Sequence, residues 1–98
     1  MREVMEKYGE PELIYQQVND DDPIIYNREL FEKWKKAKIA LLELYRDPES
    51  ECNAGHFVNR IYVDSEGNYW LTRYWIDHIG YTWDEVEIYI IHKQNKGD

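Results

Sequence analysis

Three histidines and one cysteine are the residues of this chain best suited to metal binding or nucleophilic catalysis. His56, His78 and His92 are spread over the second half of the chain, whereas a metal site is typically marked by ligands at a short, regular spacing. We expect surface or capping histidines, with a metal or acid–base site at Asp77-His78 as the alternative. Cys52 lies in an acidic loop, where neighbouring carboxylates disfavour the reactive thiolate.

No other stretch has the pattern of a catalytic or cofactor site. The five glycines are isolated, so none forms a loop that could cradle a phosphate group. With twenty acidic residues, some pair of carboxylates will fall within reach by chance, and such a pair does not by itself indicate hydrolysis. We therefore expect no enzyme activity, no bound metal and no cofactor.

The acidic residues are unevenly distributed. The net charge is −8, made up of −5 over residues 1–27, +3 over residues 28–46 and −6 over residues 47–98. This balance argues against direct binding of nucleic acid or of an anionic membrane, and it fits a basic protein partner or simple solubility. The acids gather in the predicted connections: Asp20, Asp21, Asp22, Asp47, Glu49, Glu51, Asp84, Glu85 and Glu87.

Aromatic residues are abundant, with four Trp and nine Tyr. Both types fill a core, but they also favour half-exposed binding positions, because each side chain combines an apolar ring with a group that forms hydrogen bonds. Tyr81 and Trp83 lie in a connection between predicted strands, and two aromatics there need either a core or a partner.

Three strands are predicted between residues 56 and 92, where apolar and polar residues alternate. The turn 64–68 joins the first two, with Gly67 supplying a positive φ. If Glu66 and Gly67 form its centre, Arg60 faces Arg73, an unfavourable pair of like charges. A carboxylate partner, stacking on an aromatic ring or a register shifted by one residue would resolve this conflict.

A long amphipathic helix is predicted over residues 23–46, starting at Asp22-Pro23 or at Asn27 and ending at Asp47-Pro48. Its apolar stripe has helical spacing, and four lysines occupy much of the other side. Residues 1–18 are predicted to add a further N-terminal helical segment. The expected fold is α+β, a three-stranded antiparallel meander packed against the long helix. The stripe consists of Leu30, Trp34, Ala37, Leu41 and Leu44.

Residues 1–98 are predicted to form a single domain, since 98 residues suit one core and no linker or repeat is visible. A single cysteine cannot form an internal disulfide, and residues 1–18 do not have the apolar segment of a signal peptide. These features indicate a cytoplasmic protein without a membrane span.

In size, charge and aromatic content the chain resembles two groups of small acidic interaction proteins. One comprises phage or mobile-element inhibitors that occupy the nucleic-acid groove of a defence or repair enzyme, such as anti-CRISPR or anti-restriction proteins. The other comprises immunity proteins and antitoxins that block a basic toxin. The leading hypothesis is a DNA-mimicking inhibitor of a basic nucleic-acid-binding enzyme, and a homo-oligomeric structural module, for example a homodimer, is a further alternative. The expected contact residues are Asp20, Asp21, Asp22, Tyr81, Trp83, Asp84, Glu85 and Glu87.

Overall fold

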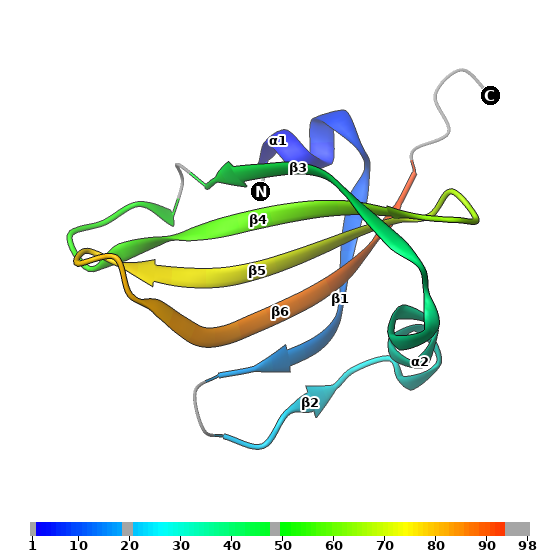
Figure 1. The fold of residues 1–98 in the computed structure, drawn as a ribbon, viewed down its shortest axis with the longest axis horizontal. Helices are drawn as coiled ribbons and strands as arrows, with labels where there is room; N and C mark the ends of the chain where they lie inside the picture. Colours follow the sequence, from blue (N-terminus) through cyan, green and yellow to red (C-terminus); the bar gives the residue numbers. More distant parts are fainter. Residues whose placement is uncertain (1, 19–20, 48–49, 94–98) are drawn as a thin grey trace.

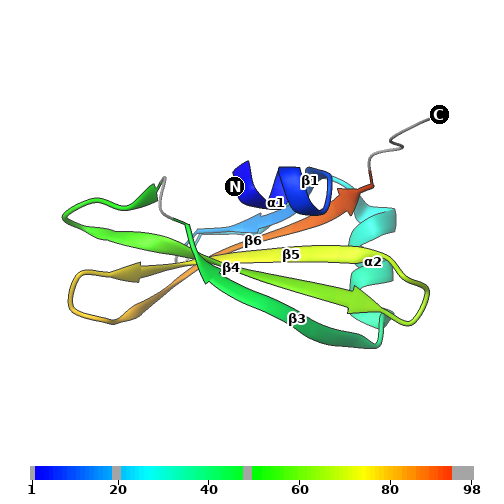
Figure 2. The same ribbon diagram turned by 90° about the horizontal axis from the view of Figure 1, so that it is seen from above.

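The fold is an open six-stranded antiparallel sheet with one short helix on each face (Figures 1 and 2). The computed structural model describes residues 2–18, 21–47 and 50–93, without the side chains of residues 45 and 82–85. The strand order is β2-β1-β6-β5-β4-β3, so that β2 and β3 are the two edges. The elements in chain order are α1 (Arg2–Lys7), β1 (Glu10–Gln17), β2 (Ile24–Ile25), α2 (Arg28–Lys36), β3 (Ile39–Arg46), β4 (Gly55–Asp64), β5 (Tyr69–Asp77) and β6 (Thr82–His92).

The predicted architecture, a three-stranded meander on a long helix, is wrong. The helix expected over residues 23–46 is limited to the nine residues of α2, and residues 39–46 form the edge strand β3. Strands β4, β5 and β6 belong to the larger sheet, with β3 on one side and β1 on the other.

A β-bulge in β3 explains why this strand has the apolar spacing of a helix. Leu41 pairs with Tyr62 and Leu44 with Arg60, and the register shifts between them at Leu42. Tyr62 and Arg60 are two residues apart on β4 and therefore point to the same face. The extra residue thus places Leu41 and Leu44 on one face at a spacing of three, which a helix also produces.

The predicted N-terminal helical segment is wrong beyond Lys7, because residues 10–17 form β1. This strand also contains a bulge, between Leu13 and Tyr15, so its apolar residues do not alternate regularly. Pro11 pairs with Ile91 of β6, in a part of β1 that β2 does not reach. Proline is tolerated there because an edge position needs no outward hydrogen-bond donor.

Each face of the sheet has its own apolar core, and each core is closed by one helix. On one face Val4 of α1 packs on Ile61, Leu71 and Ile91, and Figure 2 shows α1 over this side. On the other face α2 covers a core centred on the fully buried Trp70. The residues of this second core are Ile14, Trp70, Ile88 and Ile90, with Leu30, Phe31 and Trp34 of α2 packed against them.

Helix α2 begins at Asn27, the second of the two predicted starts. The Asn27 side chain accepts a hydrogen bond from the backbone N–H of Leu30 at 3.1 Å, as a helix N-cap does. One turn further on, the ring of Trp34 lies 5.6 Å from that of Trp70. The cap therefore fixes where the helix begins, and with it the positions at which the apolar side chains of α2 contact the core.

The register of β4 and β5 is shifted by one residue from the prediction, so Arg60 faces Thr72 and Asn59 faces Arg73. The side chain of Asp64 causes the shift, because it closes a five-residue loop. Its carboxylate accepts hydrogen bonds from the backbone N–H groups of Glu66 and Asn68. This pairing separates the two arginines that the predicted register brings together.

Neither helix of the described residues has the length and apolar character needed to cross a membrane.

Candidate protein-binding surface

Two segments lie toward one end of the sheet, which we call the hairpin end: the described part of the β1–β2 connection (residues 18 and 21–23), and the β5–β6 turn with the first residues of β6 (residues 77–85). Strand β1 finishes at Gln17, which pairs with Val86 of β6. The chain that follows Gln17 therefore leaves the sheet beside the residues that precede Val86. In Figure 1 the β5–β6 hairpin is at the far left and β1 ends at the lower left, both away from α2 at the right.

The tip of the β5–β6 hairpin exposes two apolar side chains. Ile79 is 64 % and Tyr81 69 % exposed. The side chain of Asp77 fixes this turn by accepting hydrogen bonds from the backbone N–H groups of Ile79 (3.1 Å) and Tyr81 (3.0 Å). Tyr81 is therefore exposed on a turn whose backbone is held by hydrogen bonds, as expected for a connection between strands, and its role in a contact stays a prediction. Ile79 is a second exposed apolar residue of this turn, which the sequence pattern does not mark.

Acidic side chains accompany these apolar groups. Asp21 and Asp22 are exposed in the β1–β2 connection. The backbone N–H of Asp21 donates to the carbonyl of Val18 at 3.1 Å, which turns the chain back toward β2. Because this connection continues from Gln17, which pairs with Val86, it leaves the sheet next to the strand that carries Asp84 and Glu85.

Four of the predicted contact residues lie wholly or partly outside the described structure. Asp20 is outside the described residues. Trp83, Asp84 and Glu85 belong to β6, and Trp83 pairs with Trp75 of β5, but their side chains are not described. Their place in the fold is thus given by the backbone alone.

Glu87 is not exposed as Asp21 and Asp22 are, because it belongs to an internal network centred on Arg73. The Arg73 guanidinium lies 2.9 Å from Asp47 Oδ2 and 3.6 Å from Glu87 Oε1. The three side chains are only 13 %, 4 % and 14 % exposed. Gln16 and Tyr89 also donate hydrogen bonds to Glu87, and burial, followed by the nearby Glu87 charge, raises the pKa of Tyr89. The adjacent β1 and β5 thus hold Glu87 in place.

Asn59 borders this network and gives a prediction. It faces Arg73 across β4 and β5, it is fully buried, and neither polar atom of its amide has a hydrogen-bond partner among the described residues. Burying an unpaired amide costs free energy, so we expect Asn59→Leu to raise the free energy of unfolding by about 1–2 kcal/mol.

Unfolding in urea checks this prediction, with Asn68→Leu as the control. Asn68 donates to Asp64 through its side chain at 3.0 Å, so its replacement is expected to destabilise the protein. A loss of stability in Asn59→Leu would contradict the account.

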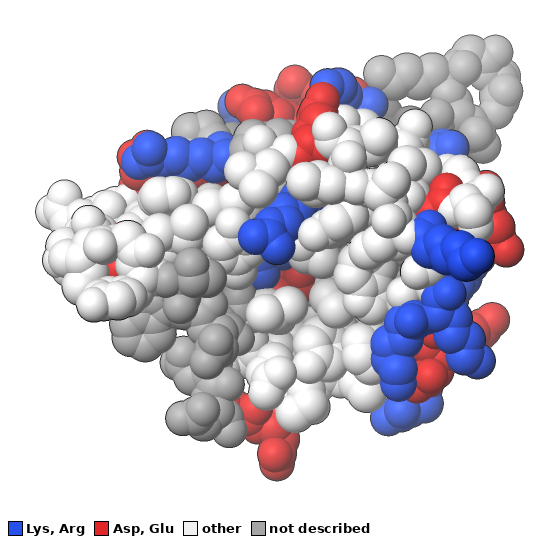
Figure 3. All heavy atoms as spheres, viewed as in Figure 1, with Lys and Arg blue, Asp and Glu red and all other residues white. Residues whose placement is uncertain are grey.

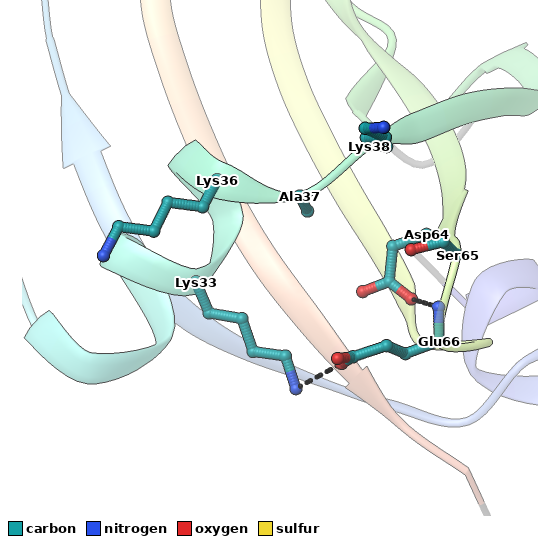
Figure 4. Close-up of a pocket in the computed structure, with 7 residues that line it drawn as sticks. All are labelled: Lys33, Lys36, Ala37, Lys38, Asp64, Ser65 and Glu66. Atoms are coloured by element: carbon teal, nitrogen blue, oxygen red, sulfur yellow. Dashed lines mark hydrogen bonds and ion pairs between the residues drawn. The ribbon is translucent and has the colours of Figure 1, made fainter.

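The lysines of α2 lie at the opposite end of the sheet, around a cavity of about 480 Å³ between α2 and the β4–β5 turn. Figure 4 shows Lys33 reaching across to Glu66, at 3.2 Å, while Lys36 points away from the cavity. Lys35 pairs with Glu32 at 3.4 Å. Two of these lysines are therefore engaged with acids of the same chain, and their ammonium groups do not converge on one point.

The histidines and the cysteine divide between the two ends of the sheet. The 52–55 turn lies against the β5–β6 hairpin, since the backbone N–H of His78 donates to the carbonyl of Ala54 at 3.1 Å. His92 lies 2.7 Å from Glu12, and this hydrogen bond lowers the pKa of Glu12. Within residues 2–18, 21–47 and 50–93, no three His, Cys, Asp or Glu side chains are grouped to hold a metal ion.

Comparisons with protein-family models, curated proteins and solved structures find no match for this chain.

Proposed function

We propose that this protein is a non-enzymatic inhibitor that binds a basic protein through the hairpin end. One observation supports the proposal. Gln17 pairs with Val86, so the connection that contains the exposed Asp21 and Asp22 leaves the sheet next to β6, the strand that carries Asp84 and Glu85 and follows the exposed Tyr81. The partner class that fits is a nucleic-acid-handling enzyme, because carboxylates on a fixed scaffold can occupy the sites that Lys and Arg offer to phosphates.

The two kinds of side chain have separate roles in this proposal. Exposed carboxylates attract a basic partner over a distance and speed its approach, an effect that added salt screens. An exposed tyrosine supplies contact area at small entropic cost and slows release. The Asp77 hydrogen bonds hold the backbone of the turn that carries Tyr81, so the backbone at this anchor does not need to be fixed on binding. Glu87 has no direct part, because its carboxylate stays with Arg73.

The test is inhibition of a panel of purified nucleases and restriction enzymes, titrated at low and moderate salt. We expect at least one enzyme to be inhibited at a stoichiometric ratio. The double variant Asp21→Lys, Asp22→Lys should weaken inhibition about tenfold or more at low salt, mainly through slower association. Tyr81→Ala should weaken it by a similar factor through faster release.

A matched control separates local contact from total charge. Glu6 and Glu10 are exposed on α1 and at the start of β1, so Glu6→Lys, Glu10→Lys changes the net charge equally at a different place. Inhibition that is indifferent to Asp21 and Asp22, or equally weakened by the control pair, would overturn the proposed surface. Neutralisation of nuclease toxins, with host-defence enzymes unaffected, would instead assign the chain to the immunity-protein alternative.

A further inference from the structure

The free edge of the sheet at β3 is unusually apolar. Leu41 and Leu44 are 53 % and 54 % exposed, and among the described strands β3 pairs with β4 alone. Natural edge strands are commonly protected by charges or prolines. Strand β3 contains no proline, and its only charged residues are Glu43, which pairs with Lys7 of α1, and Arg46. Figure 2 shows β3 at the outer margin of the sheet.

The bulge makes the pattern of faces along β3 symmetric about its middle. Ile39, Leu41, Leu44 and Arg46 pair with Asp64, Tyr62, Arg60 and Val58, which alternate along β4 and share one face. Two of these β3 residues precede the bulge and two follow it, at equal distances from the midpoint between Leu42 and Glu43. An antiparallel copy of the same strand therefore matches face to face over the whole length of β3.

We propose that β3 pairs with β3 of a second copy of this chain, antiparallel, about a two-fold axis between Leu42 and Glu43. In this register Leu41 faces Leu44 of the second copy, and Ile39 faces Arg46. The four leucines then form one apolar cluster across the axis. The two sheets join into one, and each exposed edge supplies the backbone partners of the other.

The neighbouring registers are less favourable, which selects this one. An axis through Leu42 sets Lys38 opposite Arg46 of the second copy, and an axis through Glu43 sets Glu43 opposite itself. Like charges directly across a ladder are destabilising. Either shift also pairs residues from opposite faces, because the pattern is symmetric only about the midpoint of β3. A second copy of β3 has the same arrangement of faces and therefore matches this edge. An unrelated strand would not be expected to have a bulge at the matching position.

The dimer leaves the hairpin end accessible. Strands β1 and β6, which carry the acidic connections, are separated from β3 by β5 and β4, so the acidic connections remain outside the joined edge. On the face shown in Figure 3, many of the charged side chains lie at the margins, while one Lys or Arg group with acidic atoms beside it lies near the centre. The proposal does not depend on the inhibitor function, since the two surfaces share no residue.

Sedimentation velocity over a range of protein concentrations tests the dimer. We expect a species with twice the 12.0 kDa mass of one chain. We expect Leu44→Asp to reduce the population of this dimer at least tenfold.

The matched control is Ile79→Asp, which places the same charge on another exposed apolar residue and should leave the dimer intact. A monomer at every concentration, or a dimer unchanged by Leu44→Asp, would overturn the proposal.

Cysteine pairs test the register, with the native Cys52, which is free and exposed, replaced by serine. Directly opposite residues of an antiparallel pair have Cα atoms about 4.5–5.5 Å apart, within the range of a disulfide. Leu41→Cys with Leu44→Cys should therefore give a covalent dimer on oxidation. Leu41→Cys alone should not, because the bulge leaves Leu41 and its copy offset by about 7 Å along the strands, in addition to the spacing between the strands. Equal crosslinking of both variants would refute this register. Both changes keep an apolar side chain, so the result also decides the proposal if Leu44→Asp fails to fold.

Discussion

Arg73→Met is expected to lower the free energy of unfolding by about 3–5 kcal/mol, measured by urea denaturation at neutral pH. Arg73 lies between two carboxylates, Asp47 and Glu87, which are 4 % and 14 % exposed. Methionine fills a similar volume but leaves both carboxylates without their cation in a site shielded from water. The guanidinium also lies 4.1 Å from the ring centre of Phe57, and this contact is lost as well.

The control is Arg46→Met. Arg46 pairs with Glu51, but both side chains are about half exposed, and a pair of this kind contributes less than about 1 kcal/mol. Adding Glu87→Gln to Arg73→Met should recover part of the loss, because it removes one of the two carboxylate charges that Arg73 neutralises. A cost for Arg73→Met as small as that for Arg46→Met would show that water reaches the network and replaces the arginine.

Asp64→Asn is expected to cost about 2–4 kcal/mol. The nearly buried Asp64 carboxylate accepts four hydrogen bonds, from the backbone N–H groups of Glu66 and Asn68, the Asn68 side chain and Trp70 Nε1, at 2.8–3.0 Å. An amide in its place turns one acceptor into a donor, and an amide nitrogen beside Trp70 leaves the buried indole N–H unpaired. The control is Glu66→Gln, in the same turn, which removes only an exposed ion pair with Lys33.

The same residue predicts how stability changes with pH. Burial acts to raise the pKa of Asp64, but the hydrogen bonds from Trp70, Asn68 and Glu66 outweigh it and hold the pKa below its ordinary value of 3.8. The unfolded chain then binds this proton more readily than the folded protein does. The contribution of Asp64 is therefore complete above that ordinary value and decreases as the pH falls toward the lowered pKa.

Denaturation series at neutral and acidic pH check this sign. The gap in stability between the wild type and Asp64→Asn should narrow as the solution is acidified below about pH 4. A gap that widens on acidification would mean that the carboxyl is protonated more readily in the folded protein, contrary to its hydrogen bonds.

Local sequence determines the features of this protein that depend on neighbouring residues. The alternation of apolar and polar residues between 56 and 92 marks this region as extended, and Asn27 marks the start of α2. The connection containing Tyr81 is exposed, as expected for a turn between strands. In each case a few adjacent residues fix the backbone by their own geometry and hydrogen bonding.

Only the tertiary structure decides the features that depend on distant pairing. The bulges in β1 and β3 give these strands an irregular apolar spacing, so the sequence predicts helix where the sheet requires strands. Arg73 and Asp47 are twenty-six residues apart in the sequence. No local pattern predicts that Arg73 also pairs with Glu87, so the sequence does not indicate that the Glu87 side chain is internal. Side-chain periodicity reports the conformation of one segment, whereas strand partners, bulges and internal ion pairs are fixed by the packing of the whole chain.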